Sequence, residues 1–122
     1  MLYVLTGSDV IKAKARAQEL AGDSEVVRCG EGGEAFERAP SYISARALFS
    51  PKTTLILDRP LEDESGKLLL VEQIEYLIDT DTLVIAIQPD VPAPLLKSLR
   101  ANKKIKLESF DLAEKIKGTL AG

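Results

Sequence analysis

The sequence contains no histidine, no tryptophan and only one cysteine among its 122 residues. Without histidine the chain has no imidazole base, which excludes Ser-His-Asp and Cys-His nucleophile arrangements and removes the commonest zinc ligand. The single cysteine, Cys29, allows neither an internal disulfide nor a cluster of thiolate metal ligands. These absences exclude the familiar hydrolytic sites, and they favour a reducing compartment in which Cys29 is a small apolar filler.

Long apolar runs and a positive net charge are also missing. No apolar run approaches the roughly 20 residues that span a membrane, and Met1 is not followed by the basic and apolar regions of a signal peptide. A balance of 16 Lys and Arg against 19 Asp and Glu gives a net charge of -3, which argues against a dedicated nucleic-acid surface. We therefore expect a cytoplasmic, one-domain protein with no membrane partner.

Apolar, β-branched segments alternate with helical patterns along the chain. Strands are expected at residues 2–6, 25–29, 53–58, 82–87 and 104–108. This alternation predicts an α/β fold: a three-layer sandwich with a mostly parallel five-stranded sheet and helices on both faces. The continuous apolar strands at 54–57 and 83–87 belong in the middle, and the alternating, charged strand at 104–108 belongs at an edge.

Capping residues and prolines set the expected helix boundaries. Ser8 or Asp9 caps a first helix that ends at Gly22, and Pro40 ends a helical turn that begins at Phe36. Three further helices are expected over 41–49 with Ser41 as its cap, over 67–78, and after the prolines at 92 and 94. Asp111 is expected to cap a last helix that carries the apolar residues Leu112, Ile116 and Leu120.

The turn after the first strand lacks the features of a phosphate loop. That loop needs a second glycine directly before Lys and Ser or Thr, whereas residues 11–13 are Ile, Lys and Ala. The carboxylate of Asp9 also stands where phosphate oxygens would lie. An ordinary turn with a helix cap is the expected structure, and no nucleotide site is predicted.

Asp58, at the end of a central strand, suggests a second class of protein, a phosphoacceptor receiver domain. A receiver also needs an acidic pair after the first strand, Ser or Thr after the fourth and Lys after the fifth. The chain offers only Asp9, Gln88 and Glu108-Ser109 at these places. A receiver-like signalling domain that is phosphorylated on Asp58 is therefore kept as the alternative function.

Two acidic stretches and one basic cluster complete the charged features. Residues 62–64 and 79–82 lack the central glycine and distal glutamate of a calcium loop, so solvated loops are expected and no metal site is predicted. The basic cluster is expected to protect the edge strand, although weak contact with a phosphate backbone stays open. It consists of Lys97, Arg100, Lys103, Lys104 and Lys106.

Leu48 and Phe49 stand at the expected end of a short helix, just before Pro51. They either fill the core or form a wedge that enters a pocket of a partner. As a wedge, each side chain would contribute roughly 1.5–3 kcal/mol on full burial. Periodicity by itself favours the core.

Several stretches, in order, look like parts of one known family. Residues 2–9 look like its opening strand and Gly-x-Asp/Glu turn, and residues 47–57 look like its Leu-Phe pair, basic residue and following strand. Residues 81–87, 95–99 and 105–110 look like its closing strand, helix and strand. Over nearly its whole length the chain thus resembles the first domain of the delta subunit of bacterial DNA polymerase III, the clamp-loader subunit that opens the sliding clamp.

This resemblance implies a fold and a function. Residues 1–122 would form a single AAA+ (P-loop NTPase-like) domain with strand order 5-1-4-3-2 and without a functional phosphate loop. The domain would act in DNA replication as a non-catalytic clamp-binding domain, with no cofactor. In the family the Leu-Phe pair enters a hydrophobic pocket of the clamp, the beta subunit. The implied clamp-binding residues are Leu48 and Phe49, flanked by Ser44, Ala47, Ser50 and Pro51.

The chain departs from the family pattern in two respects. The clamp-binding pattern often has Gln four residues before the Leu, where this chain has Ser44, which reaches less far and forms fewer hydrogen bonds. The family's lid and collar domains are not present, so the chain is expected to be an isolated domain or a reduced relative. Other clamp-loader subunits would be partners only within a longer chain, and DNA contact would be at most indirect.

Overall fold

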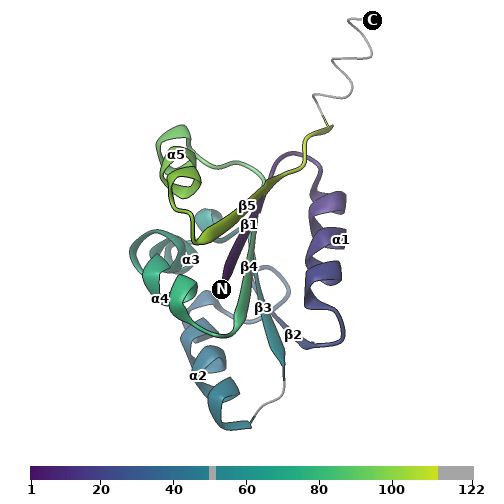
Figure 1. Ribbon diagram of the computed structural model, residues 1–122, viewed down its shortest axis with the longest axis vertical. Helices are drawn as coiled ribbons and strands as arrows, with labels where there is room; N and C mark the ends of the chain where they lie inside the picture. Colours follow the sequence, from purple (N-terminus) through teal and green to yellow (C-terminus); the bar gives the residue numbers. More distant parts are fainter. Residues whose placement is uncertain (50–51, 113–122) are drawn as a thin grey trace, which may run out of the picture.

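The computed structural model describes the backbone of residues 1–49 and 52–112, and the side chains of 1–44 and 52–112. Within these residues strands and helices alternate, as the sequence predicts (Figure 1). The strands are β1 (Leu2–Thr6), β2 (Glu25–Cys29), β3 (Thr53–Asp58), β4 (Leu83–Gln88) and β5 (Ile105–Ser109). The helices are α1 (Val10–Ala21), α2 (Ala39–Phe49), α3 (Glu64–Lys67), α4 (Ile74–Asp79) and α5 (Ala93–Ala101).

The five strands form one sheet in the order β2-β3-β4-β1-β5, and all four pairings are parallel. Read from the β5 edge, this is the order 5-1-4-3-2. The predicted α/β class and parallel sheet are thus confirmed. The apolar strands β3 and β4 lie inside the sheet and the charged strand β5 lies at an edge, as predicted.

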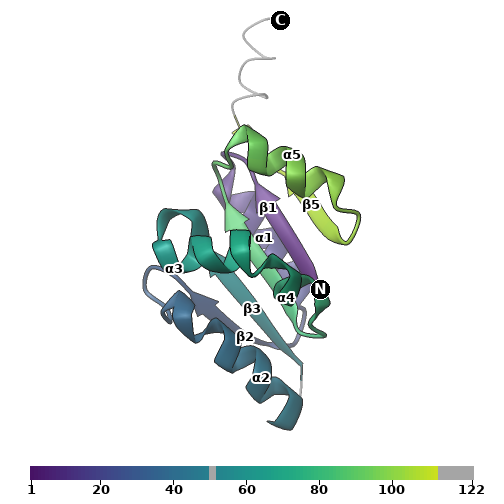
Figure 2. The ribbon, with the colours of Figure 1, turned by 90° about the vertical axis from the view of Figure 1, so that its left-hand side faces the viewer.

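Helices cover both faces of the sheet, but unequally. Among the described residues, α1 is the helix on one face, while α2, α3, α4 and α5 lie on the other (Figures 1 and 2). The small side chains of Ala13 and Ala17 let α1 approach the apolar side chains Leu5, Ile85 and Ile87 closely. The opposite face holds the larger core.

The β1–α1 connection agrees with the prediction, and the boundaries of the strands lie within one residue of those expected. Asp9 caps α1 by accepting a hydrogen bond from Lys12 N at 3.1 Å, and Gly22 ends the helix. β4 is shifted by one residue from the expected 82–87. The expected last helix lies outside the described residues after Leu112, and the Asp111 carboxylate accepts hydrogen bonds from Ser8 N and Oγ.

Two helix predictions are wrong. α2 begins at Ala39, so Pro40 lies in its first turn rather than ending a helical turn, and Ser41 is not the cap. Proline suits a first turn because the nitrogen there needs no hydrogen bond within the helix. Pro40 is therefore accommodated at the start of α2 and does not break a helix.

The single helix expected over 67–78 is instead broken into three parts. α3 begins at Glu64 because the Asp63 carboxylate accepts hydrogen bonds from Ser65 N and Gly66 N. A π-helical turn, Leu68–Glu72, follows and is closed by a bond from Gln73 N to the Leu68 oxygen at 3.0 Å. α4 then begins at Ile74.

Candidate functional site

The end of α2 is the place where the candidate clamp-binding residues fall. Ala39 and Ile43 bury one side of this helix against the sheet, while Ser44 is exposed. The chain returns to the sheet through exposed Lys52 and the first residue of β3, Thr53. In both views the end of α2 lies at the opposite end of the molecule from α5 (Figures 1 and 2).

The structure places Ser44 and positions 47, 48 and 49 on the last two turns of α2. The side chains of Ala47, Leu48 and Phe49, and all of Ser50 and Pro51, lie outside the described residues. At about 100° per residue, position 48 lies about 20° from position 41 and about 40° from position 44, and both of those serines are exposed. Position 49 lies within about 20° of position 42, where Tyr42 is half-buried. The two positions therefore continue different stripes of the helix.

The turn between β1 and α1 is closed by the chain's own later residues. Gly7 N donates to the Pro89 oxygen at 3.1 Å, and Asp9 N donates to the Phe110 oxygen at 2.9 Å. Ser8 N donates to the Asp111 carboxylate at 3.2 Å. In a phosphate loop such backbone N–H groups point at the ligand. Here they are already bonded to protein oxygens.

Gly7 makes this closure possible. Its φ is +112°, a conformation that favours glycine, and a Cβ there would lie 2.0 Å from the Phe110 oxygen. The backbone after β5 thus fills the space beside the turn.

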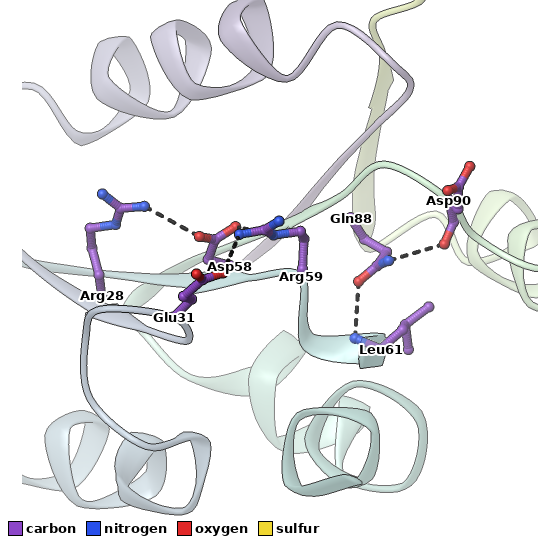
Figure 3. Close-up of polar contacts among 7 residues, drawn as sticks. All are labelled: Arg28, Glu31, Asp58, Arg59, Leu61, Gln88 and Asp90. Carbon is purple, nitrogen blue, oxygen red and sulfur yellow. Dashed lines mark hydrogen bonds and ion pairs between the residues drawn. The ribbon is translucent and has the colours of Figure 1, made fainter. Parts of the chain in front are cut away.

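Asp58 lies at the carboxyl end of β3, with its side chain 5% exposed. It pairs with Arg28 at 3.4 Å and with Arg59 at 3.3 Å, and Arg59 also reaches Glu31 at 3.2 Å (Figure 3). The nearby Asp58 carboxylate is the main cause that raises the pKa of Arg59. The carboxylate is thus held between two guanidinium groups.

Beside Asp58 is a cleft of about 490 Å³. It is lined by residues of the 30–37 loop together with Asp58, Arg59, Glu62 and Asp63. Six of its lining residues are acidic and Arg59 is the one basic residue among those that line it. This balance of charge disfavours anions such as nucleotide phosphates.

Gln88, at the end of β4, is buried, and both polar atoms of its side-chain amide are hydrogen-bonded. Its Oε1 accepts from Leu61 N at 2.9 Å and its Nε2 donates to the Asp90 oxygen at 3.1 Å (Figure 3). These bonds fix the loop after β3 against the loop after β4. Gln88 therefore has a structural role.

Sequence reasoning missed the arginines around Asp58 and the cleft beside them. Arg28 and Asp58 come from strands that pair in register, Arg28 opposite Ile56, so alternate residues reach the same face. The local sequence carries no signal for this contact, because it depends on the pairing of β2 with β3 in the sheet. Across the described ranges no group of three or more His, Cys, Asp or Glu side chains could hold a metal ion.

Comparisons with known proteins found no family model and no curated protein that matches this sequence. Among the residues with a described structure, no helix is both long and apolar enough to cross a membrane. The sheet topology by itself shows the class, an α/β domain with a five-stranded parallel sheet.

Proposed function

We propose that this chain is an AAA+-like, non-catalytic domain that binds a sliding clamp and helps to open it, as in the clamp-loader delta subunit that it resembles. The observation that carries this proposal is the strand order 5-1-4-3-2, which is the order that the resemblance implies. Alternating strands and helices do not themselves require this order, since doubly wound sheets also occur as 2-1-3-4-5 and 3-2-1-4-5.

The closed β1–α1 turn supports the non-catalytic part of the proposal. ATP binding in a P-loop fold needs free backbone N–H groups after β1, and those of Gly7, Ser8 and Asp9 have protein acceptors. ATP would then be handled by other subunits, and clamp opening would draw on binding energy alone.

The position of the Leu-Phe pair supports the clamp-binding part. Leu48 and Phe49 fall at the end of a helix that lies at an extremity of the molecule (Figure 2). Position 48 continues the stripe of exposed Ser41 and Ser44. A Leu-Phe wedge buried in an apolar pocket of the clamp would contribute about 3–6 kcal/mol, which corresponds to two to four decades in Kd.

The test is a pull-down with the cognate sliding clamp. Leu48→Ala combined with Phe49→Ala is expected to abolish capture while the far-UV circular dichroism and the unfolding midpoint show a folded protein. The matched control is Leu68→Ala with Val71→Ala, because these apolar side chains are 45% and 41% exposed on a different segment. Unchanged capture of the Leu48 and Phe49 variant would refute the site, and its unfolding would assign the pair to the core.

The receiver alternative is not favoured by the structure. The receiver order 2-1-3-4-5 places the first strand between the second and third, whereas here β1 lies between β4 and β5. A receiver domain needs acidic side chains after its first strand to bind a cation, whereas the Asp9 carboxylate caps α1. A phosphate adduct on Asp58 after treatment with Mg²⁺ and a small phosphodonor would overturn this conclusion.

A further inference from the structure

One edge of the sheet is formed by β2, which pairs with β3 on one side only (Figure 2). Glu25 N donates to the Lys52 oxygen at 2.9 Å, so residues 25, 27 and 29 direct their backbone groups to β3. Because successive residues of a strand alternate, Val26 and Arg28 direct their N–H and C=O groups outward, away from the sheet.

The chain itself covers the carboxyl half of this edge. Glu34 N donates to the Arg28 oxygen at 2.8 Å, and Gly30 N donates to the Glu34 oxygen at 2.9 Å. A Cβ on Gly33 would lie 2.5 Å from the Arg28 oxygen, so the loop lies directly against the strand. The amino half has no such cover: among residues 1–49 and 52–112, neither Val26 N nor Val26 O has a hydrogen-bond partner.

The uncovered half also lacks the usual protection of an edge strand. Residues 24–27 are Ser, Glu, Val and Val, with no lysine or proline, whereas β5 at the other edge carries Lys106. The Val26 side chain is 41% exposed. It lines a groove of about 350 Å³ between α1 and the sheet, together with the apolar side chains of Ala17 and Ile56. An exposed, apolar edge of this kind favours pairing with another strand.

A second copy of the same strand matches the unpaired groups. In an antiparallel pair with a twofold axis beside Val26, this residue lies opposite its own copy at a Cα distance of about 5.5 Å, and each Val26 N donates to the other Val26 oxygen. Arg28 N then faces the Ser24 oxygen of the other copy. The two remaining groups of that pair are already bonded, because Ser24 N donates to the Ala21 oxygen at 3.1 Å and the Arg28 oxygen accepts from Glu34 N.

The charges of β2 favour the same register. With the axis beside Val26, Glu25 lies opposite Val27 and no like charges oppose each other. An axis beside Glu25 would set two glutamates opposite each other, which destabilises a strand pair. An axis beside Val27 would direct Val26 N to the Arg28 oxygen, which is already bonded within its own chain.

We propose that two copies of this chain associate through their β2 edges, which pair antiparallel about Val26 and join the two sheets into one. The inference does not rest on the proposed clamp contact, because it uses the outer side of β2, whereas α2 packs beside β3. So short an edge gives a small interface, and we expect a weak dimer with a Kd of about 10 µM to 1 mM.

The test is sedimentation velocity of the purified chain from about 5 µM to about 1 mM, over which its mass should rise from that of a monomer toward that of a dimer. Val26→Lys should keep the chain monomeric, because two ammonium groups would lie opposite each other. Val26→Thr, which keeps the backbone bonds and the β-branched shape, should dimerise like the wild type. The matched control is Val71→Lys, since Val71 is also 41% exposed, and it should dimerise as well.

Backbone hydrogen exchange, measured by NMR on the wild-type chain, locates the contact even if Val26→Lys fails to fold. Where about nine-tenths of the chain is dimeric, the N–H groups of Val26 and Arg28 should exchange about tenfold more slowly than in the dilute chain. Exchange at Val26 that does not slow would overturn the proposal.

A chain that stays monomeric to about 1 mM would overturn it as well, and would indicate that the edge accepts a strand of another protein instead. Equal dimerisation by folded Val26→Lys and the wild type would also overturn it. Leu48→Ala with Phe49→Ala should dimerise like the wild type. Loss of the dimer in that variant but not in Val26→Lys would place the contact at the end of α2 and refute pairing through β2.

Discussion

Replacing Gly7 by alanine tests the closed β1–α1 turn, on which the argument against a nucleotide site depends. A Cβ at this position would lie 2.0 Å from the oxygen and 2.5 Å from the carbonyl carbon of Phe110. To reach ordinary van der Waals distance the two backbones must separate by roughly 1.4 Å. Gly7→Ala is therefore expected to open the turn.

The cost follows from two contributions. Alanine at a φ of +112° costs about 1–3 kcal/mol of backbone strain. Movement of Phe110 also disturbs its two backbone bonds, to the Thr6 oxygen at 2.7 Å and from Asp9 N at 2.9 Å, which are together worth about 1–3 kcal/mol. We expect a loss of about 2–6 kcal/mol in the free energy of unfolding.

Urea unfolding followed by circular dichroism measures this loss, and the midpoint should fall by more than about 1 M. Gly32→Ala is the matched control, because Gly32 also has a positive φ, +78°, but has no atom within 4 Å of the added Cβ. That control should lose only about 1–2 kcal/mol. Equal losses for the two variants would refute the close approach of Phe110 to Gly7.

Two further predictions concern buried groups near the strand ends. Gln88→Leu keeps a similar side-chain volume but removes the hydrogen-bond partners of Leu61 N and the Asp90 oxygen. Urea unfolding should show a loss of about 1–2 kcal/mol in the free energy of unfolding. A loss below about 0.5 kcal/mol would contradict the structural role of Gln88. Burial, and then the nearby Glu34, raises the pKa of the Cys29 thiol to about 11, so the folded state keeps its proton where the unfolded state loses it. The difference in free energy of unfolding between the wild-type chain and Cys29→Ala should be constant below about pH 9 and fall between about pH 9 and 11. A difference that stays constant over this whole pH range would show that the thiol titrates alike in the folded and unfolded states.

Most of the fold follows from local sequence patterns. The strands at 2–6, 25–29 and 53–58 were predicted from apolar, β-branched runs, and their bounds agree with β1, β2 and β3. Apolar and charged patterns placed β3 and β4 inside the sheet and β5 at an edge, but the full strand order could not be derived from them. It came from the resemblance alone.

The helical region between β3 and β4 shows where local patterns fail. The periodicity of residues 67–78 predicted one helix, but the Asp63 cap starts α3 earlier and the bond from Gln73 N to the Leu68 oxygen spans five residues. A π-helical turn shifts the register of the residues after it, so a period of 3.6 could not follow the segment.

The candidate site also has features that are local in the sequence and contacts that join distant residues. The Leu-Phe positions at the end of α2 were found from a short sequence stretch, since helix, pair and proline are neighbours in the chain. The closure of the β1–α1 turn joins Ser8 to Asp111, and the pairing around Asp58 joins residues of separate strands. Contacts between such distant residues depend on the sheet order and therefore could not be predicted from the sequence alone.

Clamp binding through the Leu-Phe pair is tested most directly by isothermal titration calorimetry, in which the purified wild-type chain is titrated with the purified cognate sliding clamp. We expect saturable binding of the wild-type chain and a Kd at least about 100-fold weaker for Leu48→Ala with Phe49→Ala. The Kd of Leu68→Ala with Val71→Ala should be unchanged. Absence of binding by the folded wild-type chain, or equal binding by all three proteins, would refute clamp binding through the Leu-Phe pair.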